Sequence, residues 1–159
     1  GFMFDATLGE NIAMGLVGAN IDDVRASITE LGLETWVAGL PRGLDTEVGE
    51  RGEGLSVGER QLVALARAQM ADPGLLILDE ATSALDYDTE RRVCDNLLDN
   101  LDHCTVFFIT HRLTTVQPAD LIVLMDRGAV MEAGTHQELM ARRGWYFALY
   151  QSQQQEQGI

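Results

Sequence analysis

Lysine is absent from this chain, and basic residues are few. All 11 basic side chains belong to arginines, against 25 aspartates and glutamates, which gives a formal net charge of −14. Without lysine the chain cannot contain the phosphate-binding loop G-x-x-x-x-G-K-[ST], whose lysine neutralises the phosphates that the backbone cradles. The acidic balance argues against a nucleic-acid partner, because such proteins usually present a basic face.

Cysteines, long apolar runs and targeting segments are equally limited. Cys94 and Cys104 form no CxxC pair and stand beside no cluster of metal ligands, so we interpret them as reduced structural thiols. No apolar run approaches the roughly 18 residues that cross a bilayer, and no secretory signal peptide is visible. Because the chain begins at "GFMFDATLGEN" without a methionine, we expect it to be part of a longer protein.

Apolar residues, in contrast, make up 46% of the chain, which indicates a globular fold. Capping-box spacing (S/T-x-x-E) occurs at Thr7, Ser56 and Thr135, each time just before a run with helical apolar spacing. The patterns predict short helices within the first 40 residues and an irregular loop over 41–54. The remaining predictions are helices over 55–72, 88–101 (apolar face Val93, Leu97, Leu98 and Leu101), 135–144 and from about 145, and strands over 75–79, 105–110, 120–126 and 129–134.

Strands that alternate with helices, and that are continuously apolar, predict an α/β layer fold with a mostly parallel sheet. The last two predicted strands are joined by a tight turn at Arg127-Gly128, which fits an antiparallel hairpin at the edge of the sheet. Ligands bind such sheets at the carboxyl ends of the strands. Asp79, Glu80 and His111 all follow strands in this way.

The stretch "LLILDE" places two carboxylates at the end of a buried strand. Because side chains alternate along a strand, Asp79 and Glu80 are expected to diverge, so that one faces a metal ion and the other an attacking water. Phosphoryl transfer from a nucleotide needs this division, since Mg²⁺ takes one or two carboxylates and a separate group orients the nucleophile. The alternative is an ordinary helix cap with a solvated first turn.

Four motifs in order carry a family resemblance. "LSVGERQLVALARAQMADPGLLILDEATSALD" resembles the signature motif, Walker B motif and D-loop of an ABC transporter ATPase domain, and "ITHRL" resembles its switch-histidine segment. "TEVGERG" resembles the loop that exporters place against transmembrane coupling helices. "DEATSALD", with Ala81 instead of proline, resembles the exporter branch of the family. The resemblance extends from the first residues to about Tyr150.

The resemblance implies roles for these positions. Asp79 is expected to hold the Mg²⁺ shell, Glu80 to act as general base, and His111 to contact the γ-phosphate of ATP. The signature is expected to bind ATP held by the opposite domain, and the D-loop to pass between the two domains. These motifs comprise Ser56, Val57, Gly58 and Glu59 for the signature, Ser83, Ala84, Leu85 and Asp86 for the D-loop, and Thr46, Glu47, Val48, Gly49, Glu50, Arg51 and Gly52 for the coupling loop.

A structural reading stands beside each of these roles. Ser56 and Glu59 also form a capping box, and the coupling-loop charges could simply be solvated. The free N–H groups of a helix N-terminus favour phosphate, Gly58 permits close backbone approach, and Ser56 can donate its hydroxyl. The family signature is LSGGQ, so Val57 and Glu59 depart from it, and Glu59 adds a carboxylate near the expected nucleotide. We treat this "GERQ" form as a variant.

The resemblance implies an incomplete P-loop NTPase (RecA-like) core with a mostly parallel sheet, plus a helical signature subdomain. We divide the chain into the helical subdomain with coupling loop and signature helix (1–72), the C-terminal part of the ATPase core (73–150) and a disordered tail (151–159). The cofactors implied are ATP and Mg²⁺. The partners implied are a second ATPase domain and the transmembrane domain of the same transporter, at the cytoplasmic face of the plasma (inner) membrane.

The expected function is therefore the C-terminal part of an exporter ATPase subunit that couples ATP hydrolysis to export of an unknown substrate. The alternatives are a DNA-associated or mechanical ABC ATPase and a non-catalytic half of a heterodimeric transporter. The phosphate-binding loop is expected upstream of Gly1, and the chain by itself is expected to be inactive.

Overall fold

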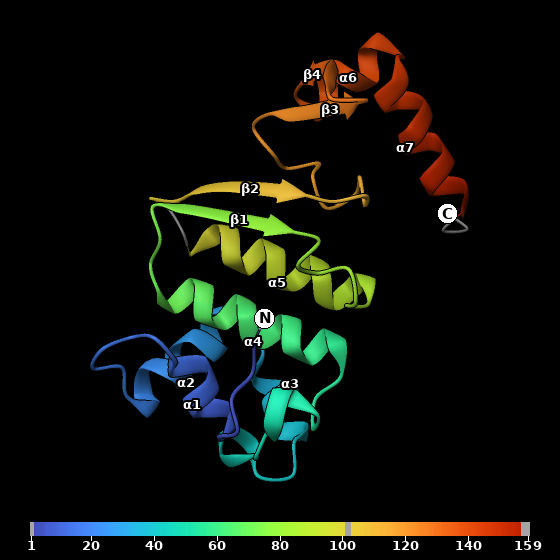
Figure 1. The fold of residues 1–159 in the computed structure, drawn as a ribbon. Helices are drawn as coiled ribbons and strands as arrows, with labels where there is room; N and C mark the ends of the chain where they lie inside the picture. Colours follow the sequence, from blue (N-terminus) through green and yellow to red (C-terminus); the bar gives the residue numbers. More distant parts are fainter. Residues whose placement is uncertain (1, 101–102, 157–159) are drawn as a thin grey trace. The chain divides into compact units, whose positions relative to one another are not determined.

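The computed structural model describes residues 2–100 and 103–156, and it forms two units, one ending at Ile109 and the other beginning at Thr110 (Figure 1). The sequence-based boundary between residues 72 and 73 falls inside the first unit, in the connection between its last long helix before the sheet and its first strand. The predicted helical subdomain and the first two strands of the predicted ATPase core therefore belong to one unit. Leu101, predicted on an apolar helix face, lies outside the described residues.

Three short helices begin the first unit: α1 (Leu8–Ala13), α2 (Ile21–Glu30) and α3 (Glu34–Gly39). The predicted capping box is present at α1, where the Thr7 side chain accepts from the backbone N–H of Glu10 and the Glu10 carboxylate accepts from that of Thr7. Leu8 and Ile12 are fully buried against the rest of the core. Ile21, at the first turn of α2, is 46% exposed and lines an open cavity.

The second half of the first unit consists of α4 (Val57–Met70), β1 (Leu75–Asp79), α5 (Tyr87–Asp99) and β2 (Thr105–Ile109). β1 and β2 are parallel, with Leu75 opposite Thr105 and Asp79 opposite Ile109. In Figure 1, α5 and α4 lie on one side of this pair. The prediction of parallel strands alternating with helices is confirmed.

The prediction that both strands are buried is only half right. Side chains alternate across the sheet, and Leu76 and Leu78 face the core while Ile77 and Phe107 on the other face are 59% and 57% exposed. The helices described in this unit cover one face of the pair. The second face of the pair is therefore apolar although it is exposed to solvent. In a sheet with one solvated face, apolar and polar residues normally alternate along each strand.

The second unit contains β3 (Ile122–Asp126), β4 (Ala129–Gly134), α6 (His136–Arg142) and α7 (Trp145–Glu156). β3 and β4 form the predicted antiparallel hairpin, and Arg127 (φ 47°) and Gly128 (φ 78°) both take the left-handed backbone that such two-residue turns require. The hairpin forms its own two-stranded sheet among the described residues rather than an edge of the parallel pair. Its core contains Leu113, Ile122, Leu139 and Tyr146.

The tail is a correction. Residues 151–156, predicted to be disordered, continue helix α7, while 157–159 lie outside the described residues. Glutamine is a good helix former, and two of the tail glutamines have partners. The Gln153 amide bonds the backbone of His111 and Leu113, and Gln154 bonds the Tyr150 hydroxyl. Composition suggested disorder because it cannot show such contacts.

Candidate functional site

Asp79 and Glu80 lie where β1 ends, and both side chains are exposed. Asp79 is the last residue of the strand. Glu80 has left it: its backbone is left-handed (φ 47°), and its N–H donates to the carbonyl of Ile109 at 2.9 Å. The alternation of side chains along the strand therefore ends at Asp79. The direction of the Glu80 side chain is set by its left-handed backbone. Non-glycine residues in this conformation are uncommon and cluster at functional sites.

The D-loop follows as two overlapping turns. The N–H of Ser83 donates to the carbonyl of Glu80 (3.1 Å), and the N–H of Leu85 donates to that of Thr82 (3.0 Å). Leu85 is buried, while Ser83 and Ala84 are exposed. The loop therefore packs on the core through the Leu85 side chain, with residues 83 and 84 at the surface.

Two buried polar residues that the sequence reading missed hold this loop from below. The Thr82 hydroxyl donates to the Glu90 carboxylate at 2.6 Å, and the two residues are 6% and 2% exposed. A buried carboxylate is stable only when it is hydrogen-bonded. One signal was available in the sequence: Glu90 lies three residues before Val93 and seven before Leu97, on the buried stripe of α5.

Asp86, the last residue of the predicted D-loop, is the N-cap of α5. Its side chain accepts from the N–H of Thr89 at 3.0 Å, and this bonding lowers the pKa of Asp86. The capping alternative is therefore realised at this position. It does not compete with a role between two domains, since the residue is exposed.

The signature residues form the predicted capping box at the start of α4. Ser56 is the N-cap, and its hydroxyl accepts from the N–H of Glu59 while the Glu59 carboxylate accepts from the N–H of Ser56 at 2.7 Å. The Trp36 indole donates to the same carboxylate at 3.1 Å. Burial works to raise the pKa of Glu59, but the hydrogen bonds from Ser56 and Trp36 prevail and lower it. The carboxylate that departs from the family signature is thus occupied by bonds within its own chain.

Gly58 is small for a reason within its own chain. A Cβ added there would lie 2.9 Å from the carbonyl oxygen of Ala84 and 3.3 Å from the Leu85 side chain. The start of the signature helix therefore packs directly on the D-loop. Val57, in contrast, is 57% exposed.

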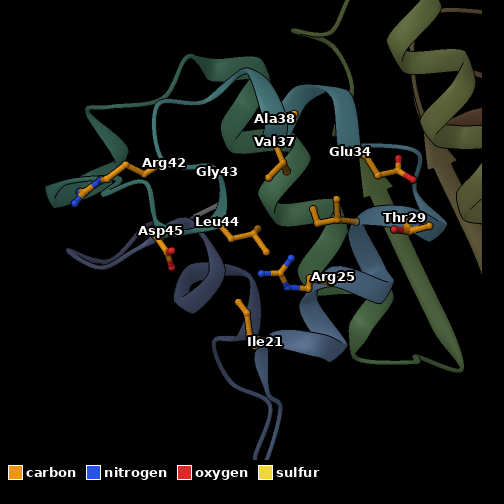
Figure 2. Close-up of a pocket in the computed structure, with 11 residues that line it drawn as sticks. Ile21, Arg25, Thr29, Glu34, Val37, Ala38, Arg42, Gly43, Leu44 and Asp45 are labelled. Atoms are coloured by element: carbon orange, nitrogen blue, oxygen red, sulfur yellow. The ribbon is translucent and has the colours of Figure 1, made fainter.

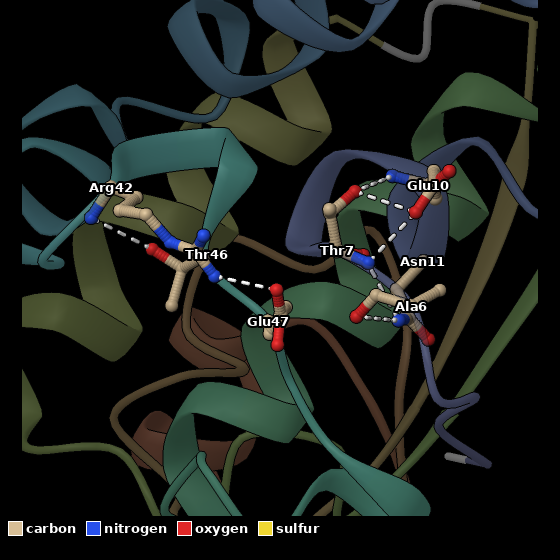
Figure 3. Close-up of polar contacts among 7 residues, drawn as sticks. All are labelled: Ala6, Thr7, Glu10, Asn11, Arg42, Thr46 and Glu47. Atoms are coloured by element: carbon tan, nitrogen blue, oxygen red, sulfur yellow. Dashed lines mark hydrogen bonds and ion pairs between the residues drawn. The ribbon is translucent and has the colours of Figure 1, made fainter.

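The first part of the predicted coupling loop is bound by backbone contacts to the start of α1 and to the segment before it. The N–H of Leu8 donates to the carbonyl of Thr46 (2.8 Å), and the N–H of Val48 donates to that of Ala6 (3.1 Å). Figure 3 shows the polar side chains around this bridge. The Thr46 hydroxyl accepts from the N–H of Arg42, and Glu47 pairs with the guanidinium of Arg42 at 2.9 Å. Val48 is fully buried.

The second part of the coupling loop turns through residues with positive φ. These are Gly49 (φ 73°, ψ 169°), Arg51 (φ 58°) and Gly52 (φ 77°), and 50–52 form a short 3-10 helix. Arg60 of α4 donates to the carbonyl of Gly52 at 3.1 Å. The loop is thus ordered and fastened to the signature helix, while Glu50 and Arg51 remain exposed.

His111 lies in the second unit, two residues after the end of β2, and is exposed. Its carbonyl accepts from the Gln153 side chain at 2.5 Å, and the same amide accepts from the N–H of Leu113. Asp79 and Glu80 belong to the first unit, and each unit is described by itself. Convergence of the imidazole with the two carboxylates therefore stays a prediction.

Comparison with known proteins identifies the family. Residues 4–83, just over half of the chain, match the family model described as ABC transporter. The chain belongs to the ABC transporter family. It is 45% identical over 152 residues to a Bacillus subtilis protein described as a probable multidrug resistance ABC transporter ATP-binding/permease protein, covering 96% of this chain and 26% of that protein.

Two further likenesses come from other members of the ABC transporter family. An ATP-dependent lipid A-core flippase of Pseudomonas fluorescens is 45% identical, with 92% of this chain and 25% of the flippase covered. The solved structure of a bacterial Atm1-family ABC exporter with ATP bound has a TM-score of 0.88 and 41% identity, covering 96% of this chain and 27% of the exporter chain. This chain therefore spans about a quarter of the length of these relatives.

A cavity of about 400 Å³ lies elsewhere in this ABC transporter chain, between α2, α3 and the segment 42–45. Figure 2 shows the Arg25 guanidinium pointing into it, with the apolar side chains of Ile21 and Leu44 nearby. None of the predicted site residues lines this cavity. Among residues 2–100 and 103–156, no group of three or more metal-ligating side chains gathers, and no helix is long and apolar enough to span a membrane.

Proposed function

We propose that this chain is the C-terminal part of the ATPase subunit of an ABC exporter and that it couples ATP binding and hydrolysis to export. The observation that carries the proposal is the pair of exposed carboxylates at the carboxyl end of the parallel strand β1, with Glu80 held in a left-handed backbone. The likeness to exporters at 41–45% identity supports the same conclusion.

Asp79 and Glu80 fit a magnesium nucleotide in complementary ways. Asp79 offers one exposed carboxylate, which suits Mg²⁺ because this ion keeps several waters and is shared with the phosphates. Glu80 accepts the proton of the attacking water or orients it, as general base. Bound Mg²⁺ supplies charge neutralisation at the terminal phosphate. The chain contains no lysine, so the phosphate-binding loop must come from residues outside it.

The signature helix acts on a second site. Ser56 is exposed at the N-terminus of α4, and a helix N-terminus attracts phosphate. In the proposed dimer Ser56 and this N-terminus bind ATP held by the opposite ATPase domain, and the D-loop runs along the boundary between the two domains. His111 completes each site by contacting the γ-phosphate.

The coupling loop is the proposed contact with the transmembrane domain. Its exposed residues Glu47, Glu50 and Arg51 offer charged side chains on a rigid support, because Val48 and Gly52 are buried and Arg60 fastens the loop to α4. Such a loop transmits force better than a mobile one. In this proposal the chain lies at the cytoplasmic face of a membrane transporter, and the exported substrate stays open.

Two other functions are weaker. A DNA-associated ABC ATPase is disfavoured by the net charge of −14, which repels a polyanion. A non-catalytic partner half is disfavoured by Glu80, since such a half has no use for a general base. A DNA-associated ATPase would also have no use for an exposed coupling loop beside the signature, because that loop serves a transmembrane domain.

Steady-state ATP hydrolysis by the full-length protein tests the proposal. Replacing Glu80 by Gln removes the general base but keeps the shape, and we expect a rate about 10²–10⁴-fold lower. Glu34→Gln is the matched control, because Glu34 is exposed on α3 and is outside the site; its rate should equal that of the wild type. An unchanged rate for Glu80→Gln would remove Glu80 from the role.

The isolated chain of 159 residues provides a second test. Asp79, Glu80 and His111 by themselves offer no phosphate cradle, so ATP should bind weakly or not at all in calorimetry. Tight ATP binding by the isolated chain would contradict the proposed division of the site between this chain and upstream residues.

A further inference from the structure

Gln61 of the signature helix makes three hydrogen bonds, and all of them reach the loop that contains Glu80. Its Nε2 donates to the Glu80 carbonyl and to the Ser83 hydroxyl, each at 3.2 Å. Its Oε1 accepts from the N–H of Ala84 at 3.0 Å. One half-buried amide thus binds both ends of the five-residue segment 80–84.

The bond to Glu80 falls on a strained peptide. A left-handed non-glycine residue persists only where its surroundings fix it. The Glu80 N–H is held by Ile109 and its carbonyl by both Ser83 and Gln61. The bond with Ile109 belongs to the sheet and the bond with Ser83 belongs to the turn. The bond with Gln61 comes from helix α4.

The same face of α4 brings Gly58 against the loop. Residues three apart share a helix face, so Gly58 and Gln61 both point toward residues 83–84. The narrow space beside Gly58, where a Cβ would lie 2.9 Å from the Ala84 carbonyl, leaves α4 and the loop little room to slide. Any displacement of the start of α4 is therefore passed to the loop through Gln61.

We infer that Gln61 is a positioning residue that links the signature helix to the general base of the same chain. The inference rests on the proposed function, in which Glu80 serves ATP on its own domain while Ser56 and Gly58 contact ATP on the opposite domain. When the signature closes on ATP of the opposite domain, Gln61 then transmits the movement of α4 to Glu80, which acts on ATP of its own domain. It touches no substrate and acts through Glu80.

The test is ATP hydrolysis by the full-length protein carrying Gln61→Met, which keeps the volume and helix propensity but loses the three hydrogen bonds. We expect kcat to fall about tenfold, with a change in KM for ATP smaller than about twofold, because the base is displaced and nucleotide contacts are kept. Gln61→Ala should behave in the same way. Gln137→Ala, an exposed glutamine on α6, is the control and should leave both constants unchanged.

A double mutant separates positioning from a merely structural role. Because Gln61 acts through the carboxylate of Glu80, adding Gln61→Met to Glu80→Gln should not lower the residual rate by more than about twofold. Amide hydrogen exchange of Ala84 should accelerate in Gln61→Met while the melting temperature is kept. Additive losses in the double mutant, or a wild-type kcat in Gln61→Met, would overturn the inference.

The proposed function fails separately. If the wild type does not hydrolyse ATP, or if Glu80→Gln is fully active, the function itself is wrong. If the wild type is active and Glu80→Gln is slow, only the behaviour of the Gln61 variants decides the inference.

Discussion

The coupling loop (46–52) and the base loop (80–86) are both irregular segments fastened to α4, but they are held by different means. Backbone bridges to Ala6 and Leu8, a buried valine and two glycines with positive φ fix most of the coupling loop, and the Arg60 side chain ties its end to α4. The base loop is held by the side chains of Gln61 and Glu90, and a glutamate occupies its left-handed position. Arg51 also has a positive φ, so glycine is not obligatory for that backbone in the coupling loop. Arg51 nevertheless lies between Gly49 and Gly52.

The difference indicates what each loop is for. A loop fixed by its backbone can vary its exposed side chains and still present a firm surface, which suits contact with a partner. In a loop fixed by side chains, each contact controls one atom of the site, which suits chemistry. The position of Glu80 supports this reading, because glycine would relieve the strain there but would supply no carboxylate.

The largest effect on stability is expected at Gly52. Alanine there meets the left-handed strain (φ 77°) and a Cβ placed 2.8 Å from the buried Met3 side chain, and should destabilise the chain by about 3 kcal/mol. Gly128→Ala is the matched variant, with φ 78° and open space around the Cβ, and should cost about 1 kcal/mol. Urea unfolding of the two variants measures the difference. Equal losses would mean that packing does not fix the coupling loop.

The next effect is expected below the base loop. Glu90→Ala leaves the buried Thr82 hydroxyl without its acceptor and should destabilise the chain by about 1–3 kcal/mol. Glu47→Ala in the coupling loop removes an exposed ion pair with Arg42 and should cost about 0.5 kcal/mol or less. The same urea titration applies. A coupling-loop loss as large as that of Glu90→Ala would abolish the contrast between the loops.

The smallest effect concerns pH and the start of α4. The pKa of Glu59 is lowered in the folded chain, so its stabilisation is complete above the ordinary glutamate pKa and is lost as pH falls through the lowered value. Wild type should thus lose about 0.5 kcal/mol more than Glu59→Gln on acidification from pH 7 to about pH 3, a small difference because solvent screens the carboxylate.

The difference between the two proteins is the quantity to measure, by urea unfolding at each pH. The pKa of Glu10 and Asp86 is lowered as well, and both variants share that contribution. Parallel pH profiles for wild type and Glu59→Gln would show that the Glu59 carboxylate contributes nothing to the cap in solution.

Local features were predictable and long-range ones were not. The capping boxes at Thr7, Ser56 and Thr135 and the tight turn at Arg127-Gly128 follow from residues three or fewer apart, and all are confirmed. The bonds from Gln61 to residues 80–84 join positions about twenty residues apart, and no spacing rule predicts them. The helix at the tail was missed for the same reason, because its bond to the His111 backbone joins residues 42 positions apart.

The sheet shows a further limit of sequence reading. Apolar runs correctly located β1 and β2, but a run says nothing of what covers each face, and Ile77 and Phe107 are more than half exposed. The position of Glu80 was also predicted from its motif, whereas its left-handed backbone depends on contacts from Ile109 and Gln61.

Glu80 and His111 are proposed to act on the same terminal phosphate, and a structure of the full-length protein with magnesium and a slowly hydrolysed ATP analogue would show both groups at once. We expect the Glu80 carboxylate within hydrogen-bonding reach of the attacking water, about 3 Å, with the His111 imidazole contacting the γ-phosphate. An imidazole directed away from that phosphate, or a carboxylate with no water between it and the nucleotide, would show that the two residues do not share one site.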